Sequence, residues 1–351
     1  MSPGARSVAL VEKSAPSRGF LRRIVAVSSV VLITLAGLEG MVRMWGYSAP
    51  QICDPIYRPF EKTKEIPYIH KSNLVQARAR GLAIISTDGL GLRTTRGSGT
   101  PSSKPPGEYR IAIVGDSVTF GEGVERTEDT FAQVLENTLN LGQPGIMARV
   151  FNFGATAYSV KEMALTLQYR VLDIEPDLVV MAIIPDDFNL ARTPTINGKG
   201  YLIDRRLTRF NPPDSMPRRV LRGLHLSYVL RDVGLRFFLE PRVDFLLALS
   251  EGRIPESYRH LLEFRNTAEQ NRLSYVIALV PSGPGKDWGA LPGQLERDRV
   301  RFVDLSFLSN GFSEEQYSAS RFDPHPSSAV HRRIGEALAA YVRHESPIGA
   351  R

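Results

Sequence analysis

One serine stands where many α/β enzymes place a nucleophile. Ser117 directly follows Gly115 and Asp116, and these follow a short run of β-forming residues at 111–114. An apolar run that stops abruptly at a glycine is typical of a buried parallel strand. In open α/β sheets the loops just past the carboxyl ends of the strands carry the chemistry. The position of Ser117 therefore makes it a candidate nucleophile.

A histidine and an aspartate near the end of the chain could activate this serine. A serine hydroxyl needs a base to take its proton and a third group to orient that base. The segment Asp323-Pro324-His325-Pro326 offers His325 as the base and Asp323 as its partner. The two prolines fix φ on both sides of the histidine and restrict the loop. Each signal is weak alone, but together the residues predict a Ser-His-Asp triad.

Strands and helices alternate from residue 108 onward, and the sheet that they form must position the three residues. One helix begins with a Ser-x-x-Glu capping box at 159–162, and others carry apolar residues at helical spacing. The expected strands are 111–114, 150–153, 178–184, 275–280 and 300–305, and the expected helices include 127–140, 259–272 and 328–343. The alternation predicts an α/β domain at 108–345, with a three-layer, doubly wound, parallel five-stranded sheet.

Two regions fall outside this rhythm. Residues 46–107 are expected to form a linker, with a small β element that turns at Asp88-Gly89 and an exposed loop at 94–107 that is rich in Ser, Thr, Gly and Pro. Residues 188–257 are expected to form an insertion in the domain. Because part of this insertion is rich in Leu, Phe and Arg, we expect helices packed beside the sheet.

The amino-terminal region carries a candidate membrane segment. Residues 24–38 are apolar and uncharged, Glu39 interrupts them, and apolar residues then resume. A span needs about 20 residues, which the whole of 24–45 supplies. An uncleaved anchor and a cleaved signal peptide both remain open, and we favour the anchor because no clear cleavage motif follows. Positive charge at 1–23 would keep that tail cytoplasmic and place the domain outside the cytoplasm, in the periplasm or at the cell surface.

Composition argues against several other classes of protein. The net charge of +7 is spread along the chain without a recognition motif, so we expect no nucleic-acid partner. The single cysteine, Cys53, excludes an intrachain disulfide and a cysteine-based zinc site. A metal site at Asp323, His325 and His331 is disfavoured because His331 falls on the expected last helix. Gly121-Glu122-Gly123 lacks the pattern of a phosphate or dinucleotide loop, and we expect no cofactor.

Several segments resemble, in order, the SGNH (GDSL-type) hydrolase superfamily, particularly its bacterial members with an amino-terminal membrane anchor. They are 115–124 (Gly-Asp-Ser-Val-Thr-Phe-Gly-Glu-Gly-Val), 152–159, 184–188 and 323–327, with a further likeness at 87–93. The resemblance covers roughly 82–342. It implies a flavodoxin-like α/β fold in which Ser117 is the nucleophile, His325 the general base and Asp323 its partner.

The resemblance also implies an oxyanion hole, in which this chain departs from the family. The family uses the N–H of the nucleophile, here Ser117, together with a glycine N–H and an asparagine side chain. Ala157 stands in the place of the glycine and keeps an N–H. Asp186 stands in the place of the asparagine, and an ionised carboxylate can only accept hydrogen bonds. Loss of one oxyanion donor typically lowers the rate about a hundred- to a thousandfold.

Three functions remain open within this fold. The first is a serine esterase that hydrolyses an ester outside the cytoplasm, such as an O-acyl group of a surface glycan or a lipid. The second is an O-acyltransferase that uses the same triad on a polysaccharide. The third is a catalytically weakened binding or assembly protein. We favour the esterase because all three triad residues are present. A dehalogenase-type phosphatase is disfavoured, since Val118 stands where its second carboxylate is needed.

Overall fold

A parallel sheet forms the centre of the computed structural model, which describes residues 18–45, 47, 53–79, 83–97, 103–141, 147–203, 224–226, 229, 248–249, 251–252 and 254–345. Its strands are β5 (Glu108–Gly115), β6 (Met147–Asn152), β7 (Leu178–Ile183), β10 (Ser274–Leu279) and β11 (Phe302–Asp304). All pairings between them are parallel, and their order across the sheet is β6-β5-β7-β10-β11. This is the 2-1-3-4-5 order of flavodoxin-like folds, which confirms the predicted doubly wound α/β sheet.

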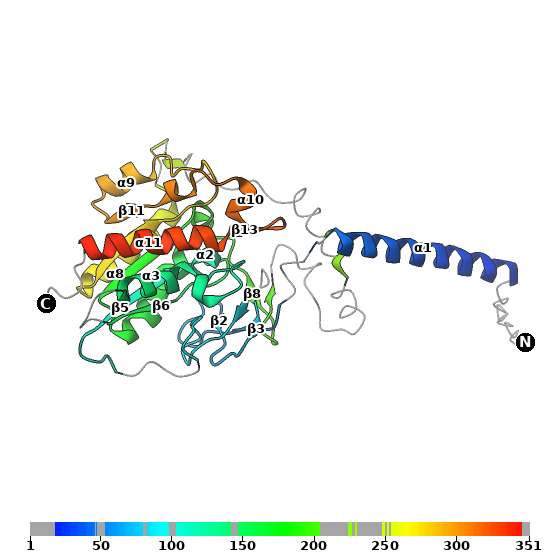
Figure 1. Cartoon of the computed structure of the whole chain (residues 1–351), viewed down its shortest axis with the longest axis horizontal. Coiled ribbons are helices and arrows are strands. Elements are labelled where there is room, and N and C mark those ends of the chain that lie inside the picture. The colour runs from blue at the N-terminus through cyan, green and yellow to red at the C-terminus, as the bar shows by residue number, and fades with distance from the viewer. Residues whose placement is uncertain are drawn as a thin grey trace, which may run out of the picture.

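Helices cover both faces of the sheet. The long ones in the domain are α3 (Phe131–Asn140), α4 (Val160–Thr166), α8 (Glu256–Gln270), α9 (Leu291–Arg297) and α11 (Ser328–Glu345). Successive residues of a strand point to opposite faces. Ile111 and Ile113 of β5 therefore pack in one apolar cluster with α3 and α11, whereas Ala112 and Val114 pack in a second cluster with α4, α8 and α9. The sheet and the helices on its two faces form the three predicted layers (Figure 1).

Side-chain caps set the starts of two of these helices. The predicted capping box is confirmed, since the Ser159 N–H donates to Glu162 Oε2 at 2.9 Å. The helix expected at 127–140 is divided at Thr130, whose side chain accepts a hydrogen bond from the N–H of Gln133. Further short helices include η2 (Thr127–Asp129), η3 (Leu167–Val171), η4 (Leu172–Ile174), η7 (Ser306–Ser309) and α10 (Glu314–Tyr317).

The region expected to be a linker, 46–107, is packed against the domain over much of its described length. It contains β1 (Tyr57–Arg58), β2 (Ile69–His70), β3 (Ala77–Arg78) and β4 (Ile84–Ile85). Ile66 and Tyr68 are fully buried and belong to the same apolar cluster as α4 and α8. The linker interpretation needs this correction because strands of two residues give no periodic signal. The expected β element with its turn at Asp88 is present, and Asp88 Oδ1 accepts the N–H groups of Leu90 and Leu92.

The candidate membrane segment forms one long helix, α1 (Arg18–Met44). None of its residues is buried, and its most apolar 18-residue window has a mean hydropathy of 2.0, so by length and composition it could cross a membrane. Figure 1 shows α1 projecting away from the domain. Residues 1–17 of the predicted basic tail lie outside the described residues.

The predicted insertion at 188–257 is described only in part. Its described start forms a hairpin of β8 (Thr195–Ile196) and β9 (Leu202–Ile203). Most of the segment in which helices were expected lies outside the described residues.

We expect Gly335→Ala to destabilise the domain although alanine favours helices. A Cβ at Gly335 of α11 would lie 2.7 Å from Val134 Cγ1 and 2.8 Å from Phe131 O of α3, closer than packed atoms approach. Such overpacking costs about 1–3 kcal/mol, which exceeds the roughly 1 kcal/mol that alanine gains in a helix. Thermal unfolding should show a lower midpoint. Gly293→Ala in α9 is the matched control, because its nearest neighbour would be Arg297 at 3.6 Å. Equal midpoints for the two variants would contradict the expectation.

Candidate active site

The turn after β5 places Ser117 at the start of a short helix, α2 (Ser117–Phe120). Asp116 caps this helix, since its Oδ1 accepts the N–H of Val118 at 2.8 Å. Gly115 allows the sharp turn, because a Cβ there would lie 2.0 Å from Thr119 Oγ1. Ser117 is thus fixed at the carboxyl end of the central strand, where the sequence placed it.

The structure brings the three predicted triad residues together. His325 and Asp323 lie on β13 (Asp323–Pro326), which pairs with β12 (Ser318–Ser320) in a hairpin. His325 Nε2 lies 3.0 Å from Ser117 Oγ, and His325 Nδ1 lies 2.5 Å from Asp323 Oδ1. The N–H of His325 also donates to the same aspartate oxygen at 3.2 Å. This arrangement can move a proton from the hydroxyl to the imidazole while the aspartate holds the ring.

A second carboxylate, which the sequence analysis did not assign, lies beside the imidazole. Glu122 is buried, and its Oε2 lies 3.4 Å from His325 Nε2. This oxygen accepts no hydrogen bond from the described residues. Glu122 Oε1 accepts the hydroxyl of Thr156, which also bonds to the hydroxyl of Tyr57 at 2.6 Å. The imidazole is therefore flanked by Asp323 on one side and Glu122 on the other. The only local signal for Glu122 was its place between two glycines shortly after Ser117.

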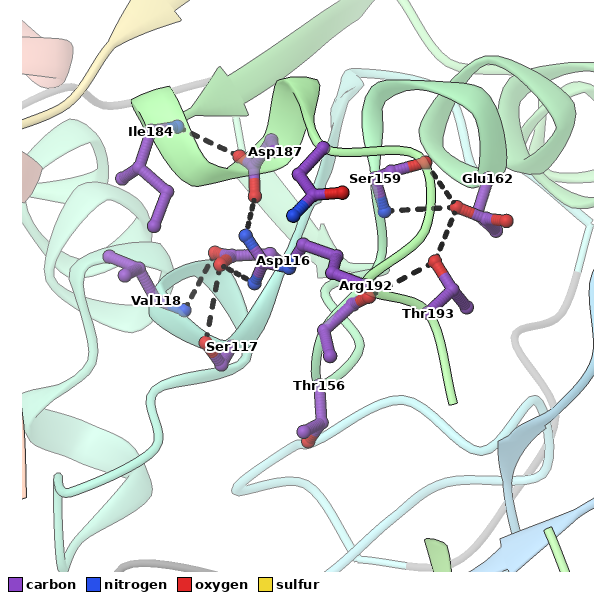
Figure 2. Close-up of polar contacts among 12 residues, drawn as sticks. Asp116, Ser117, Val118, Thr156, Ser159, Glu162, Ile184, Asp187, Arg192 and Thr193 are labelled. Carbon is purple, nitrogen blue, oxygen red and sulfur yellow. Dashed lines mark hydrogen bonds and ion pairs between the residues drawn. The ribbon is translucent and has the colours of Figure 1, made fainter. Parts of the chain in front are cut away.

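An arginine joins two buried carboxylates next to Ser117 (Figure 2). Arg192 Nη2 donates to Asp116 Oδ2 at 2.9 Å, and Nη1 donates to Asp187 Oδ1 at 2.8 Å. The Ser117 hydroxyl lies 3.2 Å from the same Asp116 oxygen. Burial and the nearby Asp116 charge raise the pKa of Asp187 well above its usual range. The two carboxylates outweigh the opposing effect of burial and raise the pKa of Arg192, so this side chain stays positively charged.

The two other positions of the expected oxyanion hole differ in their surroundings. Ala157 has φ of +58°, a left-handed conformation that glycine adopts without strain and alanine does not. Its carbonyl accepts the Thr193 hydroxyl at 3.2 Å, and that hydroxyl also bonds to Glu162 at 2.9 Å. Asp186 lies in η5 (Pro185–Phe188) with an exposed side chain, whereas the next residue, Asp187, is fully buried.

The histidine considered for a metal site has a packing role. His331 is buried in α11, and its Nδ1 accepts the N–H of Phe131 at the start of α3 at 3.1 Å. Its ring stacks on the Phe131 ring with centroids 5.6 Å apart. Burial lowers the pKa of His331 to about 3, so the ring is neutral and can accept this bond. Among the described residues, no group of three or more His, Cys, Asp or Glu side chains could hold a metal ion.

Comparison with known proteins gives structural matches only. No protein-family model and no curated protein matches the chain. The α/β hydrolase LAE5 from the metagenome of Lake Arreo, Spain, is 19% identical over 66% of this chain and 94% of its own, with a TM-score of 0.40. A catalytic mutant of Axe2, an acetylxylan esterase from Geobacillus stearothermophilus, is 14% identical over 67% and 94%, with a TM-score of 0.39. A two-domain esterase active on acetylated mannans, CEX, is 14% identical over 67% of this chain and 49% of its own, with a TM-score of 0.40. TM-scores of this size do not establish a common fold, so the chemistry has to be derived from the site itself.

We expect Glu122→Gln to change the pH dependence of any reaction that uses His325. The Glu122 carboxylate lies 3.4 Å from His325 Nε2 and favours the protonated imidazole, so its removal should lower kcat and move the acid limb of the kcat/KM profile to lower pH. Steady-state kinetics across pH on a soluble ester would measure both. Glu125→Gln, which removes an exposed carboxylate three residues later, should change neither. A lower rate with an unmoved acid limb would show that Glu122 only supports the fold.

Proposed function

We propose that this protein is a serine esterase of the SGNH type. The observation that carries the proposal is the chain of contacts from Ser117 through His325 to Asp323 at the carboxyl edge of the parallel sheet. His325 takes the hydroxyl proton while the Ser117 oxygen attacks the ester carbonyl. The tetrahedral intermediate expels the alcohol, which receives the proton from His325. Water then attacks the acyl-serine with the same histidine as base, releasing the carboxylic acid and the free enzyme.

The developing oxyanion needs donors on the side away from the imidazole. The N–H groups of Ser117 and Ala157 supply two donors in this proposal. Asp186, in the third position, supplies none while it is ionised. Arg192 offsets the negative charge of Asp116 beside the reacting centre, because its Nη2 and the Ser117 hydroxyl contact the same oxygen of Asp116. A fixed cation in a buried site stabilises negative charge more strongly than it would in water.

α1 serves in this proposal as an anchor that stays in the protein. A leader that is cut away contributes nothing to the folded domain. The last turns of α1 instead contact it, because the Glu39 carboxylate accepts the N–H groups of His225 at 3.0 Å and Leu226 at 2.8 Å. The basic residues before the apolar run favour a cytoplasmic amino terminus, which places the ester bond to be cleaved outside the cytoplasm. An O-acyl group on a surface glycan or a lipid is the ester class expected there.

We expect Ser117→Ala to abolish ester hydrolysis. The full-length protein in detergent should hydrolyse 4-nitrophenyl acetate and react with a fluorophosphonate probe. Loss of the nucleophile should lower kcat by at least about a thousandfold and remove the labelling. Ser282→Ala, which alters another serine in a loop after a strand of the same sheet, should retain both activities. Absence of labelling in the wild type from pH 5 to 9 would contradict the esterase and favour a binding or assembly protein. Turnover that rises sharply on addition of an oligosaccharide acceptor would favour the acyltransferase.

Asp186→Asn should raise the rate of hydrolysis. The amide restores a donor where the family resemblance expects one, and the gain could reach about a hundredfold if the side chain meets the oxyanion. The measurement is kcat on a soluble ester, compared with Asp173→Asn, which neutralises an exposed aspartate that pairs with Lys62. A fall in kcat would show that the Asp186 carboxylate has a task of its own. An unchanged kcat would place Asp186 beyond the reach of the oxyanion.

A further inference from the structure

The end of the candidate membrane helix contacts the hairpin that carries the catalytic histidine. The Phe322 ring meets the Trp45 ring edge-on with centroids 5.0 Å apart, and it meets the Tyr47 ring at 5.1 Å. The Arg321 guanidinium lies 5.3 Å from the centre of the Trp45 ring. Phe322 directly precedes Asp323 in the chain. The tip of the hairpin β12–β13 therefore lies at the end of α1, and Asp323 and His325 follow directly in β13.

A second set of contacts joins the last turns of α1 to the domain. Besides accepting the N–H groups of His225 and Leu226, Glu39 accepts a hydrogen bond from Arg43 Nε at 2.7 Å. His225 Nδ1 lies 2.6 Å from the carbonyl oxygen of Tyr47. Two separate contact regions oppose free rotation of the domain about the end of α1, so the helix presents the domain in one orientation.

This orientation directs the carboxyl ends of the parallel strands, where Ser117 lies, toward α1. In Figure 1 the hairpin with β13, together with β3 and β8, lies at the end of the domain nearest α1, and the described end of α11 lies at the opposite end. Trp45 lies seven positions after Leu38, where the uncharged apolar run ends, and a helix rises about 10 Å over that interval. That length matches the headgroup layer of a bilayer rather than a long stalk. A bilayer that holds α1 would have its surface close to the carboxyl ends of the strands and to Ser117.

The side chains at this end of the domain suit a membrane surface. Trp45 is half exposed at the end of the apolar helix, where aromatic residues favour the interface. Val75 and Ile84, in the region of β3 and β4, are 77% and 40% exposed although they are apolar. Arg321 is exposed at the tip of the catalytic hairpin and can meet lipid phosphates.

We propose that the active site faces the bilayer at headgroup level and that its substrate is an acyl ester carried by a lipid. This proposal rests on the proposed esterase function and adds the class of molecule that presents the ester. A lipid-borne ester stays at the depth of the triad and reaches Ser117 by lateral diffusion in the membrane. A freely soluble glycan ester would have to enter between the domain and the bilayer.

The substrate preference is tested with a variant of Val75, and a variant of Leu141 serves as its control. The probes are a fluorogenic coumarin ester with a hexadecyl chain, placed in phosphatidylcholine vesicles that contain the full-length protein, and the same ester without the chain. The wild type should cleave the anchored ester with the higher kcat/KM. Val75→Asp should lower this rate about tenfold, because the new charge resists the interface, and it should leave the soluble ester unaffected.

Leu141→Asp is the matched control for the activity test. Leu141 is 71% exposed and lies between α3 and the start of β6 in the chain. This start pairs with the start of β5, at the other end of that strand from Ser117. This variant should change neither rate. Equal cleavage of the two esters by the wild type, with no specific effect of Val75→Asp, would overturn the proposal in favour of a water-soluble substrate.

A measurement of depth tests the orientation without relying on catalysis. In a Cys53→Ser background, a fluorophore attached through Arg321→Cys should be quenched strongly by lipids that carry a nitroxide at the headgroup. A fluorophore attached through Met147→Cys, at the exposed start of β6, should be quenched little. Equal quenching, or stronger quenching at position 147, would overturn the proposed orientation. If neither ester is cleaved and no fluorophosphonate reacts, the esterase function fails while the quenching still decides the orientation.

Discussion

The structure depends on one close approach, in which the hairpin β12–β13 lies against the turn that follows β5. Ser117 and His325 are 208 residues apart in the chain, and their side chains meet at 3.0 Å. Gly123 permits the approach, because a Cβ there would lie 2.5 Å from a side-chain carbon of β12. Just beyond the hairpin, His331 of α11 accepts the N–H of Phe131 in α3. The helix layer on this face of the sheet therefore fixes the hairpin, and the hairpin in turn fixes the histidine.

The charges around Ser117 fall into two groups with different effects. The Ser117 hydroxyl has two neighbouring acceptors, His325 at 3.0 Å and Asp116 at 3.2 Å. Arg192 engages the Asp116 oxygen that faces this hydroxyl, which weakens it as an acceptor and leaves the imidazole as the better base. On the other side, Glu122 favours the protonated imidazole that results. In the proposed reaction, the first group thus directs the proton to His325, and the second stabilises the proton there.

The sequence predicted those parts of the site that depend on local patterns. Continuous apolar runs identified the strands, and the glycine that ends β5 located Ser117 at the edge where His325 also arrives. The contacts of Arg192 and Glu122 could not be predicted, because Arg192 meets Asp116 across 76 residues of chain and no local period connects them. The packing of the region at 46–107 against the domain could not be predicted either. Its strands are only two residues long and give no periodic signal, so the sequence indicated a linker.

The residues between α1 and β5 contact the candidate active site from outside the sheet. The hydroxyl of Tyr57 bonds to the Thr156 hydroxyl, which donates to Glu122 beside the imidazole. The hydroxyl of Tyr68 donates to the carbonyl of Thr156, directly before Ala157. Tyr57 and Tyr68, which follow α1 in the chain, thus support both Glu122 and the loop expected to bind the oxyanion. A shortened, soluble form of the domain would have to begin before Tyr57, because a start at β5 would remove these supports while leaving the triad residues in the chain.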